Sequence, residues 1–142
     1  MKTQGMLVVS LVTFLGCSDA GVDWIFPIPE NASVSQANQL ILGQWEWVKS
    51  LSNSTGPTLE YTPRLAGYTR QMEFLQNGVV NLYRNDSLTG TATFSIDSGT
   101  YSSSLTLVLD GNANYDFRVS DDYLGFDNRP VDGPAEFFVR RK

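Results

Sequence analysis

The chain has 142 residues, of which 42% are hydrophobic, with one cysteine, no histidine and a formal net charge of −5. This length and composition predict one small globular domain. The lack of histidine excludes Ser/His/Asp and Cys/His relays and histidine-ligated zinc or haem, and a single cysteine excludes an internal disulfide and a CxxC metal clamp. The acidic balance argues against a nucleic-acid partner, because phosphate binding needs a basic stripe.

The N-terminus has the composition of a secretory signal. Lys2 supplies a positive charge, and residues 6–16 (MLVVSLVTFLG) form an apolar run that ends just before Cys17. The run is too short for a transmembrane helix, which needs about 20 residues. Residues 14–17 (FLGC) resemble the bacterial lipobox, in which the cysteine is lipidated and becomes the new N-terminus after cleavage.

The lipobox resemblance implies a lipoprotein signal peptide at residues 1–16 and lipidation of Cys17. Prolines and small polar residues predict a lipidated N-terminus and flexible tether at 17–38, which leaves a folded domain at 39–142. A cysteine that carries two or three acyl chains anchors a protein essentially permanently in a membrane. Ser18 after the cysteine resembles lipoproteins released to the outer membrane. We therefore expect a lipid-anchored protein of the bacterial cell envelope, held at the outer membrane through Cys17.

The residues from 39 onward alternate between apolar and polar in short runs separated by turn residues, which predicts an all-β domain. The predicted strands are residues 44–51, 68–75, 79–84, 91–96, 100–109, 115–119, 123–126 and 135–141. Asn77-Gly78 is typical of a tight hairpin turn. Short sequential connections predict an antiparallel up-and-down barrel of eight strands, and a β-sandwich is the alternative.

The first predicted strand opens with the residues LGQW, in which Gly43 and Trp45 form a Gly-x-Trp. This resembles the opening signature of the lipocalin superfamily. In that family the tryptophan closes the base of the barrel against an arginine near the end of the last strand, a place held here by Arg140, or by Arg141 if the register differs by one. With the lipobox, the tether, Trp47 and the Asn-Gly turn, the chain resembles small lipocalin-like lipoproteins of Bacteroidetes-type bacteria.

The apolar faces of the predicted strands nominate the interior of the barrel. Its expected lumen residues are Trp47, Phe74, Phe94, Leu105, Leu107 and Phe117, and the same faces include Trp45, Met72, Leu82, Ile96, Leu124, Phe126 and either Phe137 or Phe138. An eight-stranded barrel is either filled by its own side chains or has room for one small ligand, and both remain open here. The long connections at residues 52–67 and 127–134 are able to gate a mouth.

The remaining motifs do not indicate a catalytic site. Glu46, Glu73 and Glu136 alternate with apolar residues, so we expect them on the solvated outer face rather than as an acid and base pair. Residues 110–121 imitate a calcium loop but lack its glycine and its final glutamate, which favours a hairpin turn. Ser87 lies in Asp-Ser-Leu, which resembles the glycan attachment sites of Bacteroidetes-type bacteria.

The sequence therefore predicts a membrane-anchored binding or accessory module, with a small apolar or amphipathic ligand or a protein as partner, and without enzymatic activity, cofactor, metal or nucleic acid. The alternative is a barrel with a packed interior that acts as a protease inhibitor or a protein-interaction module. An inhibitor needs a rigid protruding segment, whereas a carrier needs an open lumen with a few convergent polar groups.

Overall fold

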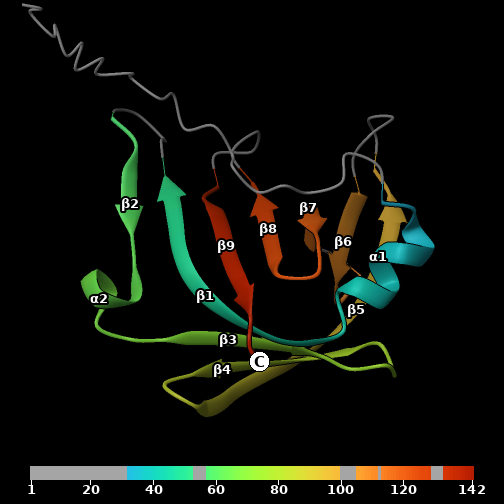
Figure 1. Cartoon of the computed structure of the whole chain (residues 1–142), viewed down its shortest axis with the longest axis horizontal. Coiled ribbons are helices and arrows are strands. Elements are labelled where there is room, and N and C mark those ends of the chain that lie inside the picture. Colours follow the sequence, from blue (N-terminus) through green and yellow to red (C-terminus); the bar gives the residue numbers. More distant parts are fainter. Residues whose placement is uncertain (1–31, 53–56, 100–104, 112, 129–132) are drawn as a thin grey trace, which may run out of the picture.

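The computed structural model describes residues 32–52, 57–99, 105–111, 113–128 and 133–142 (Figure 1). Its elements in chain order are α1 (Val34–Leu40), β1 (Gly43–Ser52), β2 (Leu59–Tyr61), α2 (Pro63–Ala66), β3 (Arg70–Phe74), β4 (Val79–Arg84), β5 (Ser87–Ser98), β6 (Leu105–Leu109), β7 (Ala113–Val119), β8 (Tyr123–Asp127) and β9 (Ala135–Arg140). None of the helices in the described ranges is long and apolar enough to cross a membrane.

The strands form a closed antiparallel barrel. The sheet order is β2-β1-β3-β4-β5-β6-β7-β8-β9, and β1 also pairs with β9, which closes the ring through eight strands. The remaining strand, β2, pairs only with the far end of β1, from Ser50 to Ser52. The predicted up-and-down barrel is therefore confirmed, and the β-sandwich is excluded because one continuous sheet joins its own two edges.

Two connections differ from the sequence expectation. The predicted strands 79–84 and 91–96 leave a longer connection between them, but the turn consists of Asn85 and Asp86, whose φ angles are 50° and 61°. A two-residue turn with positive φ at both positions returns the chain at once, so β5 begins at Ser87. The connection 52–67 contains β2 and α2, and residues 100–104 of the fifth predicted strand lie outside the described residues.

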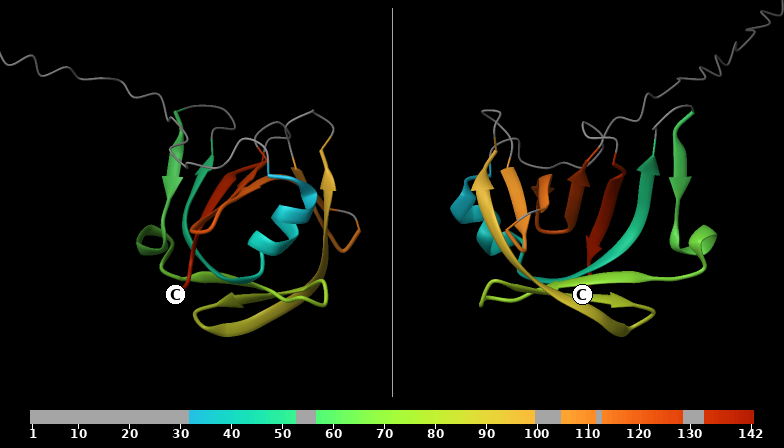
Figure 2. Two further views of the ribbon diagram at one scale, coloured as in Figure 1. Left: turned by 45° about the vertical axis from the view of Figure 1, so that its right-hand side comes forward. Right: turned by 180° about the vertical axis from the view of Figure 1, so that it is seen from behind.

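The folded domain begins earlier than expected, because α1 occupies part of the predicted tether. The Ser33 side chain accepts a hydrogen bond from the Gln36 backbone N–H at 3.2 Å, and the Gln36 side chain accepts one from the Ser33 N–H at 2.9 Å. This capping box starts a helix that buries Ala37 and Ile41 completely. Residues 33–38 thus belong to the barrel domain, and α1 lies across one of its ends (Figure 2, left). Cys17 lies outside the described residues.

The inner face of the barrel carries the main core. Its fully buried large side chains include Trp45, Phe74, Phe138, Leu107 and Leu124. Of the two phenylalanines open to either role, Phe138 joins this interior, whereas Phe137 packs with Leu51 and Ala135 in a separate cluster. A bulge in β1 between Trp47 and Lys49 shifts the strand's alternation, so that Trp47 and Ser50 both lie on the inner side.

Arg140 closes the barrel end that α1 covers. Its guanidinium carbon lies 4.2 Å from the centre of the Trp45 ring, close enough for a cation–π contact. Nη1 donates to the carbonyl of Leu42 at 2.7 Å, Nη2 to that of Leu40 at 2.5 Å, and Nε to that of Asp121. One side chain of β9 therefore ties together the end of α1, the start of β1 and the β7–β8 turn.

Gly43 fits this closure for a steric reason. Its φ is 110°, and a Cβ atom there would lie 3.1 Å from Nη1 of Arg140. Only glycine adopts this backbone conformation readily while leaving that space. Trp45 completes the closure by donating its indole N–H to the Ile41 carbonyl at 2.7 Å. The structure thus brings Gly43, Trp45 and Arg140 together, as the family resemblance implies.

We expect Arg140→Lys to lower the free energy of unfolding by about 2 kcal/mol, because lysine keeps the charge but cannot donate to three carbonyls in a planar fork. Arg141→Lys is the matched control. The Arg141 side chain is exposed and contacts Gln71 at 3.0 Å and Asp86 at 3.8 Å among the described residues, so we expect a loss below about 0.5 kcal/mol. Urea unfolding followed by tryptophan fluorescence measures both, and equal losses would contradict the role given to Arg140.

A hydrogen-bonded carboxylate lies on the outer wall. Glu73 accepts bonds from the Gln44 amide at 3.1 Å, the Asn81 amide at 3.1 Å and the Tyr83 hydroxyl at 2.9 Å. The bond from Gln44, followed by those from Asn81 and Tyr83, holds the pKa of Glu73 below its ordinary value. The same hydrogen bond to Glu73 raises the pKa of the Tyr83 hydroxyl, so one contact lowers the pKa of the carboxyl group and raises that of the phenol.

This depressed pKa predicts an acid-side loss of stability. A carboxyl group whose folded pKa lies below its unfolded pKa stabilises the fold above the unfolded value, and this contribution disappears as the pH falls through the folded value. We expect Glu73→Gln to weaken the dependence of unfolding free energy on pH across that window. Urea unfolding at a series of pH values measures it. Glu46→Gln, on the neighbouring strand, is the control, and an identical flattening in that variant would refute the assignment.

Candidate ligand-binding site

A pocket of about 400 Å³ opens at the end of the barrel away from α1. β1 starts beside α1, and β3 runs antiparallel to it, so the start of β3 and the end of β4 lie at the opposite end. Arg70 and Arg84 hold these two positions and line the pocket. Its apolar walls are Met72, Leu82, Leu109 and Phe126.

The lumen residues expected from the sequence lie deeper than this pocket. Trp47, Phe74, Leu107 and Phe117 are buried in the main core, and Phe94 and Leu105 pack against it half-buried. None of the six lines the pocket. They belong to the core cluster that also contains Ala37 and Ile41, and Trp47 extends this cluster to the Tyr68 ring beside the pocket.

Arg70 and Glu136 form an ion pair inside the pocket, with Nη1 and Oε1 2.5 Å apart. The same carboxylate oxygen accepts a bond from the Ser50 hydroxyl at 3.3 Å, and that hydroxyl accepts one from the Trp47 indole N–H at 3.0 Å. The Arg70 guanidinium also lies 5.3 Å from the centre of the Trp47 ring. The polar wall of the pocket is therefore a connected network rather than a set of independent groups.

The expectation that Glu136 faces solvent is wrong. Its side chain is 18% exposed and lies on the inner face with Phe138 and Arg140, because every second residue of β9 points inward. The sequence did not show which residues of β9 point inward, because Phe137 and Phe138 are adjacent and either could have been the inward residue. Glu73, by contrast, lies on the outer wall, so these two carboxylates do not converge on one substrate.

A stack of side chains forms the rim of the mouth. The Arg84 guanidinium lies 4.0 Å from the centre of the Tyr68 ring, which in turn stacks on Trp47 at 5.9 Å with an interplanar angle of 18°. Arg70 and Arg84 pair directly across β3 and β4, so they share the inner face. Sequence reasoning overlooked both arginines, although they continue the inward alternation of Met72 and Phe74 in β3 and of Val80 and Leu82 in β4.

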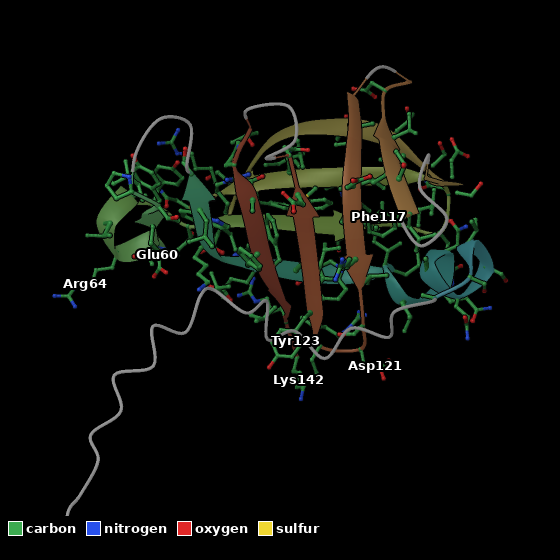
Figure 3. All side chains as sticks on the ribbon, turned by 90° about the horizontal axis from the view of Figure 1, so that it is seen from above. Glu60, Arg64, Phe117, Asp121, Tyr123 and Lys142 are labelled. Carbon is green, nitrogen blue, oxygen red and sulfur yellow. The ribbon has the colours of Figure 1, made fainter. Side chains whose placement is uncertain are left out.

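Large apolar side chains are exposed on the elements beside this mouth. Leu59 and Tyr61 on β2, Leu65 on α2 and Leu88 on β5 are 54, 47, 71 and 57% exposed. Figure 3 shows Glu60 and Arg64 on the same two elements, β2 and α2, to one side of the barrel. Ser87 is exposed at the β4–β5 turn, so the site expected to carry a glycan lies at the surface.

The calcium-like segment forms the β6–β7 hairpin. Asp110 has φ 49°, and its carboxylate accepts bonds from the Thr93 backbone N–H at 2.8 Å and the Thr93 hydroxyl at 3.2 Å. These contacts fix the turn against β5, which agrees with the preference for a hairpin over a metal loop. Within the described ranges, no group of three His, Cys, Asp or Glu residues is arranged to hold a metal ion.

Comparison with protein-family models, with curated proteins and with solved structures finds no significant match to this chain.

Proposed function

We propose that this protein is a lipid-anchored component of the bacterial cell envelope whose barrel binds a small amphipathic molecule. The observation that carries the binding proposal is the pocket of about 400 Å³, with apolar walls and a network of polar groups at its mouth. Small-molecule sites are typically pockets of roughly 300 to 1,000 Å³ with this division of apolar and polar surface. The lipid anchor is supported by the lipobox resemblance at Cys17.

A protein-interaction module is the second candidate. It is favoured by the exposed side chains of Leu59, Tyr61 and Leu65 on β2 and α2, which form an apolar surface beside the barrel. Native mass spectrometry of protein purified from the envelope separates the two. A retained small molecule supports the carrier, whereas a bound polypeptide with an empty pocket supports the interaction module.

The pocket can be filled by a single substitution. Gly90 pairs directly with the pocket residue Leu82, and a Cβ atom at Gly90 would meet no atom within 4 Å. We expect Gly90→Phe to fold but to abolish binding of an environment-sensitive amphiphilic dye, because its ring occupies the cavity. Thr91→Phe, which places the same ring on the outer face of the same strand, is the control. Fluorescence titration measures binding, and undiminished binding by Gly90→Phe would rule out this pocket.

The anchor is tested by Cys17→Ser in the full chain. We expect the variant to leave the membrane fraction and to retain residues 1–16, because acylation of the cysteine precedes cleavage of the signal. Fractionation and intact-mass measurement report both effects. Membrane association combined with cleavage after Gly16 in the variant would disprove the lipobox assignment.

A further inference from the structure

We infer that the ligand carries one anionic group, bound by Arg84 at the mouth of the pocket, with its apolar part against Leu82, Leu109 and Phe126. This inference rests on the proposed function, and it adds the chemical class of the ligand: a monoanionic amphiphile, such as a carboxylate or sulfonate with a compact apolar body. Three independent observations support it: the pairing of two arginines, the charge balance of the rim and the stacking of Arg84.

The first observation is that Arg70 and Arg84 are direct cross-strand partners on the inner face. Side chains in this position have Cβ atoms only about 5 Å apart, and like charges there destabilise a sheet. Arg70 is compensated by Glu136 at 2.5 Å. Glu136 contacts the Arg70 guanidinium and is not paired with Arg84, so the two arginines keep an excess positive charge at the pocket that both line.

The second observation is that other acidic side chains near this end are already paired. Asp86 lies 3.8 Å from Arg141, and Glu60 lies 3.5 Å from Lys49. Across the described residues, no carboxylate oxygen lies within 4.0 Å of the Arg84 guanidinium. In a chain with a net charge of −5, Arg84 is thus a cation without a carboxylate partner among the described residues, and it lines the apolar pocket.

The third observation is the way in which Arg84 is held. Its guanidinium lies over the Tyr68 ring, which is supported from below by Trp47. Stacking uses the face of the guanidinium and leaves the N–H donors at its edge for a planar or tetrahedral oxyanion. The donor is therefore ordered before the ligand arrives, which lowers the entropic cost of binding.

Two dyes with the same aromatic skeleton test the charge of the ligand. Anilinonaphthalene sulfonate carries a sulfonate, and phenylnaphthylamine is its neutral counterpart. We expect the wild-type full chain to bind the sulfonate about tenfold more tightly, because one charge-assisted contact is added. We expect Arg84→Met to remove this preference while leaving the affinity for the neutral dye unchanged. Arg84→Gln, which keeps hydrogen-bonding capacity without the charge, should give the same result.

The control is Arg64→Met, which removes an exposed cation of α2 that does not line the pocket, and it should retain the full preference. Equal wild-type affinities for the two dyes, or an equal loss of both in Arg84→Met, would overturn the anion inference alone. Failure of the wild type to bind either dye would overturn the proposed carrier function as well. Circular dichroism of each variant verifies that the barrel is intact.

Discussion

The closure of β1 against β9 is the constraint on which the rest of the structure depends. Pairing of Trp45 with Arg140 sets the register of this seam, and the Arg140 guanidinium then reaches carbonyls of Leu40, Leu42 and Asp121. A barrel has no free sheet edge only if its first and last strands meet in register. Arg140 lies on the last strand and also binds the end of α1. The same side chain therefore stabilises both the β1–β9 pairing and the position of the helix that covers the barrel end.

The bulge in β1 gives the two ends of the barrel different interiors. Before it, Trp45 and Trp47 point inward and contribute to a packed apolar core. Beyond it, Ser50 stands opposite Glu136 on the inner face, and its hydroxyl joins the indole of Trp47 to that carboxylate. A partly buried carboxylate is stabilised by a cation, and Arg70 supplies it. The bulge thus turns Ser50 inward, where its hydroxyl joins the ion pair that β3 and β9 supply.

Strand alternation predicted most of the barrel because its inner face is lined by large apolar side chains at every second position. Strand alternation failed to predict elements that do not alternate between apolar and polar residues. β2 has three exposed residues and no inner face, and α1 is a helix of seven residues whose capping box at Ser33 and Gln36 was the only strong local signal. The polar wall of the pocket was missed for a different reason: Arg70 and Glu136 are 66 residues apart, and alternation alone does not show that they meet.

Arg140 and Arg84 each lie about 4 Å from the centre of an aromatic ring, but the N–H donors of the two guanidinium groups have different partners. Arg140 lies over Trp45, and all three of its nitrogens donate to backbone carbonyls. Arg84 lies over Tyr68 at nearly the same distance, 4.0 Å against 4.2 Å, and no carboxylate in the described parts of the chain pairs with it. A guanidinium whose three nitrogens all donate to backbone carbonyls holds the structure together. A guanidinium whose face rests on a ring and whose edge is available can bind an anion without rearranging the protein, so the end of the barrel opposite Arg140 is the end suited to binding.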